Sequence, residues 1–337
     1  MKSYEYAQLG LENLTLVERD IPTPGAGEVQ VKFHAASLNY RDLLFAWGLY
    51  NPNPALPSVP FSDGAGEVTA VGSGVTQWQV GDRVSPIFMQ GWLSGPPAPE
   101  HGATALGGGS IDGVLREYAT FSQDGLVRIP DYLSYEEAAT LPCAAVTAWN
   151  ALVCVGQIKA GDTILTLGTG GVSIFALQLA KLHAAKVIAT SSSDEKLARV
   201  RELGADETIN YKTTPDWDKE VLRLTGKAGV DHVVEVGGAG TLPRSINAAR
   251  VGGLVSVIGV LTQGEGLDSM KVLMKSLRVQ GIFVGSREMS EALNRAVIQA
   301  QLKPVIDRVF DFDEAPAALK YLHSGSHFGK VVVRIGS

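Results

Sequence analysis

The segment Thr163–Gly204 constrains the fold of this 337-residue chain more than any other. An apolar run, Ile164–Leu167, leads into the sequence GTGGVS at residues 168–173, and apolar residues at helical spacing follow. A second short strand, Lys186–Thr190, and another helix come next. Strand, glycine turn, helix and strand in this order predict a βαβ unit, and hence a parallel sheet.

The glycine turn has the composition of a phosphate-binding loop. Glycines let a ligand approach the backbone closely, and the N–H groups at the start of a helix attract anions. Ser173 stands where the fingerprint has its last glycine, and its small side chain still permits close packing of helix on strand. An ordinary tight turn of an α/β protein is the alternative. We predict a dinucleotide site whose pyrophosphate contacts come from this turn: Gly168, Gly170, Gly171 and Val172.

Two patterns divide the chain into domains. The N-terminal part has closely spaced strands and glycine turns, which predict a small β-rich barrel or sandwich, whereas the following part alternates strands and helices. Two later strand-like segments, Val305–Phe310 and Lys330–Arg334, do not fit the parallel sheet and are expected to rejoin the β-rich domain. The predicted domains are residues 1–143 with 284–337, and residues 144–283.

Composition argues against several partners. The net charge is −6 and no block of Lys or Arg stands out, so neither nucleic acid nor an anionic membrane is expected as a partner. The longest uncharged run, Thr163–Ala180, contains the glycine turn and does not predict a membrane span. The N-terminus lacks the pattern of a signal peptide, and only two cysteines occur, Cys143 and Cys154. We expect a cytoplasmic protein without disulfides.

Several motifs, in order along the chain, resemble those of the medium-chain dehydrogenase/reductase superfamily. The resemblance covers essentially the whole length and implies a GroES-like catalytic domain, a Rossmann domain with a doubly wound parallel sheet, and a cleft between them. Together with the glycine turn, the segments that carry it are Gly64–Val68, Val71–Val75, Gly81–Val84, Leu141–Cys143 and Thr147–Trp149.

The positions of the zinc ligands distinguish branches of this superfamily. In its zinc alcohol dehydrogenases the catalytic ligands fall where this chain has Asn39, Ser62 and Cys143. Zinc requires three ligands of the Cys or His type, and only the cysteine remains here, with Asp63 beside the lost histidine. The segment Pro86–Gly113, where a structural zinc would lie, has no cysteine. The resemblance therefore implies a zinc-free protein with Cys143 as a small buried hydrophobe.

The residues after the second strand of the βαβ unit indicate the cofactor. NAD-binding proteins of this type have an acidic residue about twenty positions past the turn. Here Ser191 and Ser192 follow the strand, and hydroxyls can donate to a 2′-phosphate that a carboxylate would repel. By resemblance, Lys196 and Tyr211 bind that phosphate, although a solvated lysine and a strand-end tyrosine are the alternatives. We expect NADPH, with Asp194 as the residue that could instead turn toward the ribose.

The resemblance also implies contacts at the end of the Rossmann sheet. Backbone groups near Val260 and Phe283 are expected at the nicotinamide carboxamide. Relatives form dimers through the strand that corresponds to Arg278–Val284, and the apolar residues of this segment are compatible with such an edge, although a buried strand would look the same. We expect a homodimer.

The segments at residues 37–42, 61–66 and 285–287 resemble the zinc-free quinone oxidoreductase and enoyl reductase branch. Without a Lewis acid, an enzyme is best suited to acceptors that delocalise negative charge. Hydride addition to a quinone or an enone gives such an anion, which hydrogen-bond donors stabilise. The hypothesis is NADPH-dependent reduction of quinones or α,β-unsaturated carbonyls.

Three residues are candidate donors to that anion. Tyr50 aligns with the tyrosine that mitochondrial enoyl reductases use near the thioester carbonyl, although it could merely line the cleft. Asn39 could instead cap its helix, and Tyr40 could belong to the core. Two other functions stay open: a zinc-independent alcohol dehydrogenase or carbonyl reductase, and a non-catalytic NADPH-binding protein.

Overall fold

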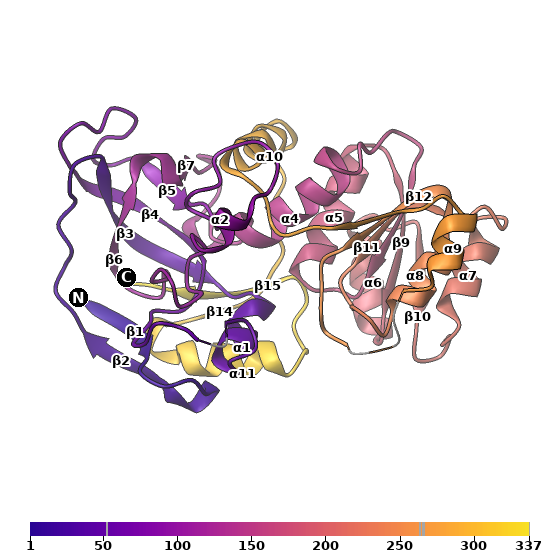
Figure 1. Cartoon of the computed structure of the whole chain (residues 1–337), viewed down its shortest axis with the longest axis horizontal. Helices are drawn as coiled ribbons and strands as arrows, with labels where there is room; N and C mark the ends of the chain where they lie inside the picture. The colour runs from indigo at the N-terminus through magenta and orange to yellow at the C-terminus, as the bar shows by residue number, and fades with distance from the viewer. Residues whose placement is uncertain (52, 263, 265–266, 337) are drawn as a thin grey trace. The chain divides into compact units, whose positions relative to one another are not determined.

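The computed structural model describes residues 1–51, 53–262, 264 and 267–336 (Figure 1). The chain divides into two compact units: unit 1 comprises Met1–Val146 and Val284–Ser337, and unit 2 comprises Thr147–Phe283. Unit 1 thus extends beyond residue 143, where the sequence placed the first boundary. The reason is that the π-helical segment Leu141–Ala145 packs on a strand of unit 1.

Unit 1 contains a sheet of seven strands that are mostly antiparallel. The order is β14-β15-β3-β4-β5-β7, and β6 also pairs with β3. The C-terminal strands rejoin the N-terminal sheet, since Val332 pairs with Ser37 in antiparallel register. The strands are β3 (Glu28–Ser37), β4 (Asp63–Val71), β5 (Arg83–Pro86), β6 (Tyr118–Ser122), β7 (Leu126–Arg128), β14 (Ile306–Phe310) and β15 (Lys330–Arg334), and β1 (Lys2–Tyr6) pairs with β2 (Leu14–Glu18) in a separate ribbon.

Alternation of side chains explains how β3 sits in this sheet. Val29, Val31 and Phe33 are fully buried, while the residues between them are partly exposed, which is the period-two pattern of a strand with one face on a core. The same core receives residues from β4 and β15. The helices of unit 1 are α1 (Tyr40–Ala46), α2 (Pro99–Gly102), α3 (Tyr135–Ala138), α10 (Arg287–Ala300) and α11 (Ala315–His323).

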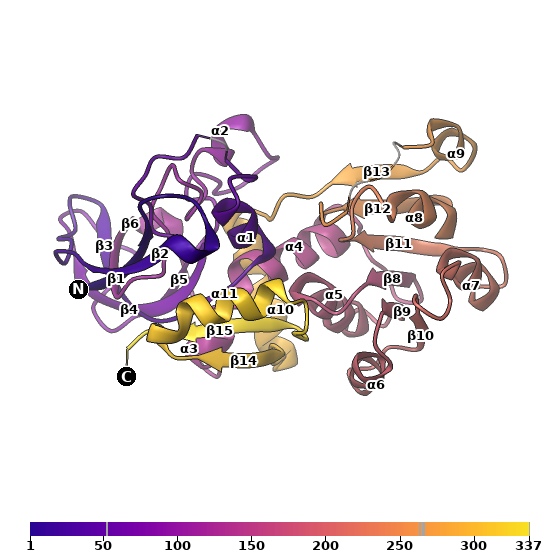
Figure 2. The same ribbon diagram turned by 90° about the horizontal axis from the view of Figure 1, so that it is seen from below.

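Helix α11 lies against β14 and β15 and was missing from the sequence-based prediction (Figure 2). Its buried residues, Ala315, Ala318, Leu319 and Leu322, recur at helical spacing, so the pattern was present in the sequence. Helix α11 covers β15, the strand that begins with Lys330.

Unit 2 is a doubly wound α/β domain, as the sequence predicted. All strands are parallel, in the order β10-β9-β8-β11-β12-β13. Helices α5 and α6 contact strands β8, β9 and β10, α8 contacts β11 and β12, and α7 packs on α8 and contacts β10. The strands are β8 (Thr163–Leu167), β9 (Lys186–Ser191), β10 (Glu207–Asn210), β11 (Val230–Glu235), β12 (Ala249–Val257) and β13 (Arg278–Gly281). The helices are α4 (Val146–Trp149) at the boundary of the units, α5 (Gly171–Leu182), α6 (Asp194–Glu202), α7 (Trp217–Leu224), α8 (Leu242–Ala248) and α9 (Ser269–Met274).

Two boundaries differ from the sequence-based prediction. Strand β13 ends at Gly281 instead of Val284, which has a left-handed backbone (φ 56°) and cannot continue a strand. The sequence predicts a helix over Ser290–Gln301, but α10 begins at Arg287, because the Ser286 hydroxyl accepts a hydrogen bond from the Met289 N–H and caps the helix. Among the described helices, none combines the length and the apolar character needed to cross a bilayer.

Candidate functional site

The glycine turn joins β8 to α5 at the carboxyl edge of the unit 2 sheet. Gly168 has a left-handed backbone (φ 72°), which favours glycine at this position. The first intrahelical hydrogen bond runs from Ile174 N to Gly170 O, so the N–H groups of the first turn have no acceptor within the helix. The Ser173 hydroxyl donates to Leu167 O at 2.6 Å and ties this turn to the strand. The geometry fits an anionic group such as a pyrophosphate.

The end of β9 presents hydroxyl groups at the same edge. Ser191 is buried, and its hydroxyl accepts a hydrogen bond from Ser193 N at 3.4 Å. The Tyr211 N–H donates to Ser191 O, and the Tyr211 side chain is exposed beside it. Asp194 accepts a hydrogen bond from Asn210 Nδ2 at 2.7 Å, so the alternative in which this carboxylate turns to a ribose would break an existing bond. Ser192 and Lys196 flank these groups in the sequence at the start of α6.

Glu235 is a residue of this edge that the sequence analysis missed. It is fully buried at the end of β11, and its carboxylate accepts hydrogen bonds from the N–H groups of Gly237 (2.8 Å) and Gly238 (3.0 Å). The hydroxyls of Thr241 and Ser245 donate to it as well. Glu235 therefore holds the loop after β11 in place. The signal in the sequence was a carboxylate at the end of a predicted strand, two positions before a glycine pair.

The remaining predicted cofactor residues follow the next two strands. Val260 lies after β12 and Phe283 after β13, and both side chains are exposed at this end of the sheet. Gly259 precedes Val260, and a Cβ there would lie only 1.7 Å from Val236 O, so the loop requires glycine. The structure thus brings the predicted cofactor residues to the carboxyl ends of parallel strands, where dinucleotides bind in open α/β sheets. Their individual roles stay predictions.

A second cluster of polar residues is buried within unit 1. Asn39 is the N-cap residue of α1, and its backbone N–H donates to Asp42 Oδ2 at 2.8 Å. Its side-chain oxygen accepts a hydrogen bond from Lys330 Nζ, which donates also to Leu38 O, both at 2.6 Å. Lys330 was not among the predicted site residues. It is 3% exposed, so a lysine charge is held inside the unit.

Asp63 joins this cluster from the start of β4. Its two carboxylate oxygens accept hydrogen bonds from the Ser62 hydroxyl (2.6 Å) and from Cys143 N (3.0 Å). Burial raises the pKa of Asp63, while the nearby Lys330 charge opposes that rise. Burial also raises the pKa of Asp42 to about 6, against the opposing effect of Arg41. The pKa of the Cys143 thiol lies far above its usual range because of burial and the charge of Asp63, so the thiol stays neutral at pH 7.

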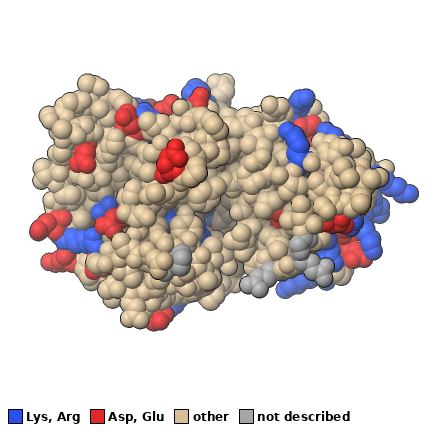
Figure 3. Space-filling view, viewed as in Figure 1, with Lys and Arg blue, Asp and Glu red and all other residues tan. Residues whose placement is uncertain are grey.

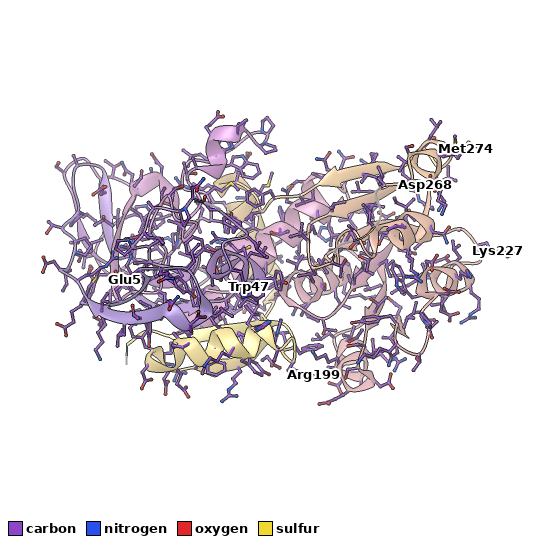
Figure 4. All side chains as sticks on the ribbon, turned by 60° about the horizontal axis from the view of Figure 1, so that its bottom comes forward. Glu5, Trp47, Arg199, Lys227, Asp268 and Met274 are labelled. Atoms are coloured by element: carbon purple, nitrogen blue, oxygen red, sulfur yellow. The ribbon has the colours of Figure 1, made fainter. Side chains whose placement is uncertain are left out.

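Tyr50 lies beside the same cluster, whereas the ring of Tyr40 packs against Trp47. The Arg41 guanidinium lies over the Tyr50 ring, 4.3 Å from its centroid, and donates to Leu106 O at 2.7 Å. Burial raises the pKa of the Tyr50 phenol, Arg41 opposes the rise, and Cys143 adds to it. Tyr40 is 39% exposed, and its ring packs edge-on against Trp47, which Figure 4 labels. Tyr40 is therefore not a core residue.

The residues at the expected zinc position do not fit a zinc ion. The Asn39 oxygen already faces an ammonium group, the Ser62 hydroxyl donates to Asp63, and the neutral Cys143 thiol is a poor ligand. A buried lysine charge next to these groups would repel a cation. Within the described residues, no group of three or more His, Cys, Asp or Glu side chains is arranged to hold a metal ion.

Basic and acidic side chains are both present on the face shown in Figure 3. Lys and Arg atoms form small separate groups there, with Asp and Glu atoms between several of them, and no continuous basic strip crosses this face. This distribution agrees with the net charge of −6.

Comparisons with known proteins place these observations in a family. Residues 25–131 match the alcohol dehydrogenase GroES-like domain, and residues 171–298 match the zinc-binding dehydrogenase domain. The chain is 45% identical over 334 residues to a zinc-type alcohol dehydrogenase-like protein of Schizosaccharomyces pombe, covering 97% of this chain and 96% of the other. It is 28% identical over 321 residues to a quinone oxidoreductase of Sus scrofa, covering 93% and 91%.

Solved structures of alcohol dehydrogenases and quinone oxidoreductases are also similar to this chain. The crystal structure of a putative alcohol dehydrogenase from Sinorhizobium meliloti superposes with a TM-score of 0.93 at 44% identity, covering 99% of this chain and 98% of the other. A quinone oxidoreductase from Escherichia coli in complex with NADPH superposes with a TM-score of 0.85 at 25% identity, covering 99% and 100%.

Proposed function

Because this chain belongs to the medium-chain dehydrogenase/reductase superfamily, we propose that it is a zinc-independent reductase of carbonyl compounds that uses NADPH. The observation that carries the proposal is the buried cluster of unit 1. In this cluster Lys330 donates to Asn39 and Cys143 N donates to Asp63, and by the sequence resemblance Asn39, Ser62 and Cys143 correspond to the zinc ligands of relatives.

The sequence analysis favoured quinones or enones over simple carbonyls, and the comparisons favour the reverse order. The more similar relatives carry alcohol dehydrogenase names, whereas the quinone oxidoreductases are more distant. A simple aldehyde or ketone is therefore the first candidate acceptor. A quinone or α,β-unsaturated carbonyl is the second, because the site lacks a zinc ligand set and such acceptors need the least charge stabilisation.

The residues of unit 1 have defined tasks in this reaction. Bound NADPH supplies the hydride, and the acceptor oxygen gains negative charge as the hydride adds. A donor held next to that oxygen lowers the barrier, because the charge develops in a site that is shielded from water. The Tyr50 phenol, with its raised pKa, keeps its proton at neutral pH and can donate it to the oxygen. Arg41, stacked on the Tyr50 ring, fixes the position of that phenol.

The experiment that tests the proposed function is a panel of acceptors assayed with NADPH. We expect reduction of an aldehyde, an enone or a quinone, with kcat unchanged after treatment with a strong zinc chelator. Elemental analysis of the active protein should find no stoichiometric zinc. Activity lost on chelation and restored by zinc would contradict the zinc-independent mechanism. Tight NADPH binding with no reduction of any acceptor would support the non-catalytic alternative.

We also propose that unit 2 forms a homodimer through the free edge of β13 and the neighbouring α9. Among the described strands β13 pairs only with β12, which leaves one edge open. In α9, Leu273 is 69% and Met274 72% exposed, and Figure 4 shows the labelled Met274 at the outside of the helix. Exposed apolar side chains next to an open strand edge are typical of an interface between copies.

Substitution of Met274 by glutamate is expected to shift the dimer toward monomer, because a charge would be buried in the apolar contact. Light scattering across a dilution series measures the shift, expected to be tenfold or more in the dissociation constant. The exposed Lys227, at the end of α7, offers a control: Lys227→Glu changes the charge of unit 2 away from α9. Equal dimer affinity in both variants would exclude this interface.

A further inference from the structure

The contact between Lys330 and Asn39 decides how the Asn39 amide is oriented. An ammonium group has donors only, so the Asn39 atom that faces Lys330 Nζ at 2.6 Å must be the oxygen, Oδ1. The amide nitrogen, Nδ2, consequently points away from Lys330. The backbone N–H of Asn39 is bonded to Asp42, which fixes the residue itself at the start of α1. The orientation of the amide thus depends on Lys330.

The Asn39 Nδ2 group is left as a buried donor. Asn39 is 9% exposed, and within the described residues Nδ2 completes no hydrogen bond of normal geometry. The amide faces the Asp63 carboxyl, whose oxygens also accept hydrogen bonds from the Ser62 hydroxyl and from Cys143 N. A hydrogen-bond contact from the Asn39 amide is among the interactions that oppose the rise in the pKa of Asp63, so one Nδ2 hydrogen is directed at that carboxyl. The second Nδ2 hydrogen is left for a ligand, and a buried donor is unfavourable until a ligand oxygen accepts its hydrogen bond.

We propose that Lys330 is a positioning residue, which holds the Asn39 amide so that Nδ2 donates to the acceptor oxygen that gains negative charge. This inference rests on the proposed carbonyl reductase function. Without Lys330 the amide could rotate by half a turn and present Oδ1, which would repel the developing charge. The lysine charge also polarises the amide and makes Nδ2 a stronger donor. The charged groups around the contact are Asp42, Asp63 and Arg41.

A purely structural role is the competing explanation, since Lys330 also joins β15 to Leu38. Asn39→Asp separates the two, because aspartate keeps an oxygen for Lys330 but lacks the amide donor. We expect Asn39→Asp to lower kcat about 100-fold, as for the loss of single donors to an oxyanion, while the contact with Lys330 is kept. Unchanged kcat in this variant would overturn the proposal.

The role of Lys330 is tested by a double-mutant cycle with the best acceptor of the wild-type enzyme. Lys330→Met is expected to lower kcat about tenfold in the wild-type background and to have no further effect on kcat in an Asn39→Leu background. Equal effects in both backgrounds would show that Lys330 does not act through Asn39. Loss of stability with unchanged kcat would assign it a structural role only.

Lys330→Gln serves if Lys330→Met does not fold. Glutamine can donate to Oδ1 of Asn39 or accept from Nδ2, so a hydrogen bond remains but the Asn39 amide is no longer held in one orientation. We expect the same loss of kcat as for Lys330→Met. The assay of the wild-type protein distinguishes failure of the proposed reductase function from failure of the proposed role of Lys330. A wild-type protein that reduces no acceptor would refute the proposed function, whereas an active wild type with unaffected variants would refute only the role of Lys330.

Discussion

Replacing Ser191 by aspartate is expected to weaken NADPH binding about 100-fold and to leave NADH binding nearly unchanged. Ser191 ends β9 at the carboxyl edge of the unit 2 sheet, where dinucleotide-binding proteins read the adenosine ribose. A carboxylate on the order of 6 Å from a 2′-phosphate, at an effective dielectric constant of about 20, costs roughly 3 kcal/mol, which corresponds to this factor. Fluorescence titration with both cofactors measures the change.

Ser191→Asn is the matched control, because asparagine has the size of aspartate without its charge. It should lose far less NADPH affinity than Ser191→Asp. If both variants bound NADPH equally well, Ser191 would lie outside the phosphate site. A wild-type protein that prefers NADH would contradict the cofactor proposal itself and direct attention to Asp194, which is bonded to Asn210 in this structure.

Replacing Glu235 by alanine is expected to destabilise unit 2 by roughly 3–5 kcal/mol and to weaken cofactor binding. Two backbone N–H groups and two hydroxyls donate to this buried carboxylate, and all except the Thr241 hydroxyl, which also donates to Gly238 O, would lose their acceptor. Leaving buried polar groups unpaired is among the largest effects of single substitutions. Urea unfolding followed by the fluorescence of Trp217, which is buried in unit 2, measures the loss.

Two control variants show whether the loss of stability in Glu235→Ala comes from its hydrogen bonds. Glu235→Gln keeps one oxygen for the Gly237 and Gly238 donors and should lose less stability than alanine. Glu207→Ala removes an exposed carboxylate from β10 of the same sheet, and such surface changes stay within about 0.5 kcal/mol. Similar losses for Glu235→Ala and Glu207→Ala would mean that the hydrogen bonds of Glu235 contribute little.

Local patterns in the sequence were sufficient for the α/β fold and for the place of the glycine turn and the serines after β9 at the carboxyl edge of its sheet, while the cofactor roles of these residues stay predictions. The glycine turn, the strand before it and the serines after β9 are neighbours along the chain, so their spacing predicts where they lie. The strand Lys330–Arg334 was also predicted with its observed bounds and was expected to rejoin the β-rich domain. These features depend on periodicity and turn chemistry, which single residues and short spacings determine.

The cluster of unit 1 could not be predicted in the same way. Lys330 and Asn39 are 291 positions apart, and only the pairing of β15 with β3 brings them together. A lysine that starts an apolar strand normally faces solvent, so its sequence context gave no sign of burial. Tyr40 shows the reverse problem: it is next to Asn39 in the chain, but successive helical positions point in different directions, and its ring faces Trp47.

The return of the C-terminal strands to the first sheet also sets an order of events during synthesis on the ribosome. All of unit 2 emerges before β14 and β15, so it can fold while the sheet of unit 1 still lacks two strands and the lysine beside Asn39. The cofactor-binding half of the molecule can therefore mature first. The sheet of unit 1, and with it the contact between Lys330 and Asn39, is complete only when the final strand has been translated.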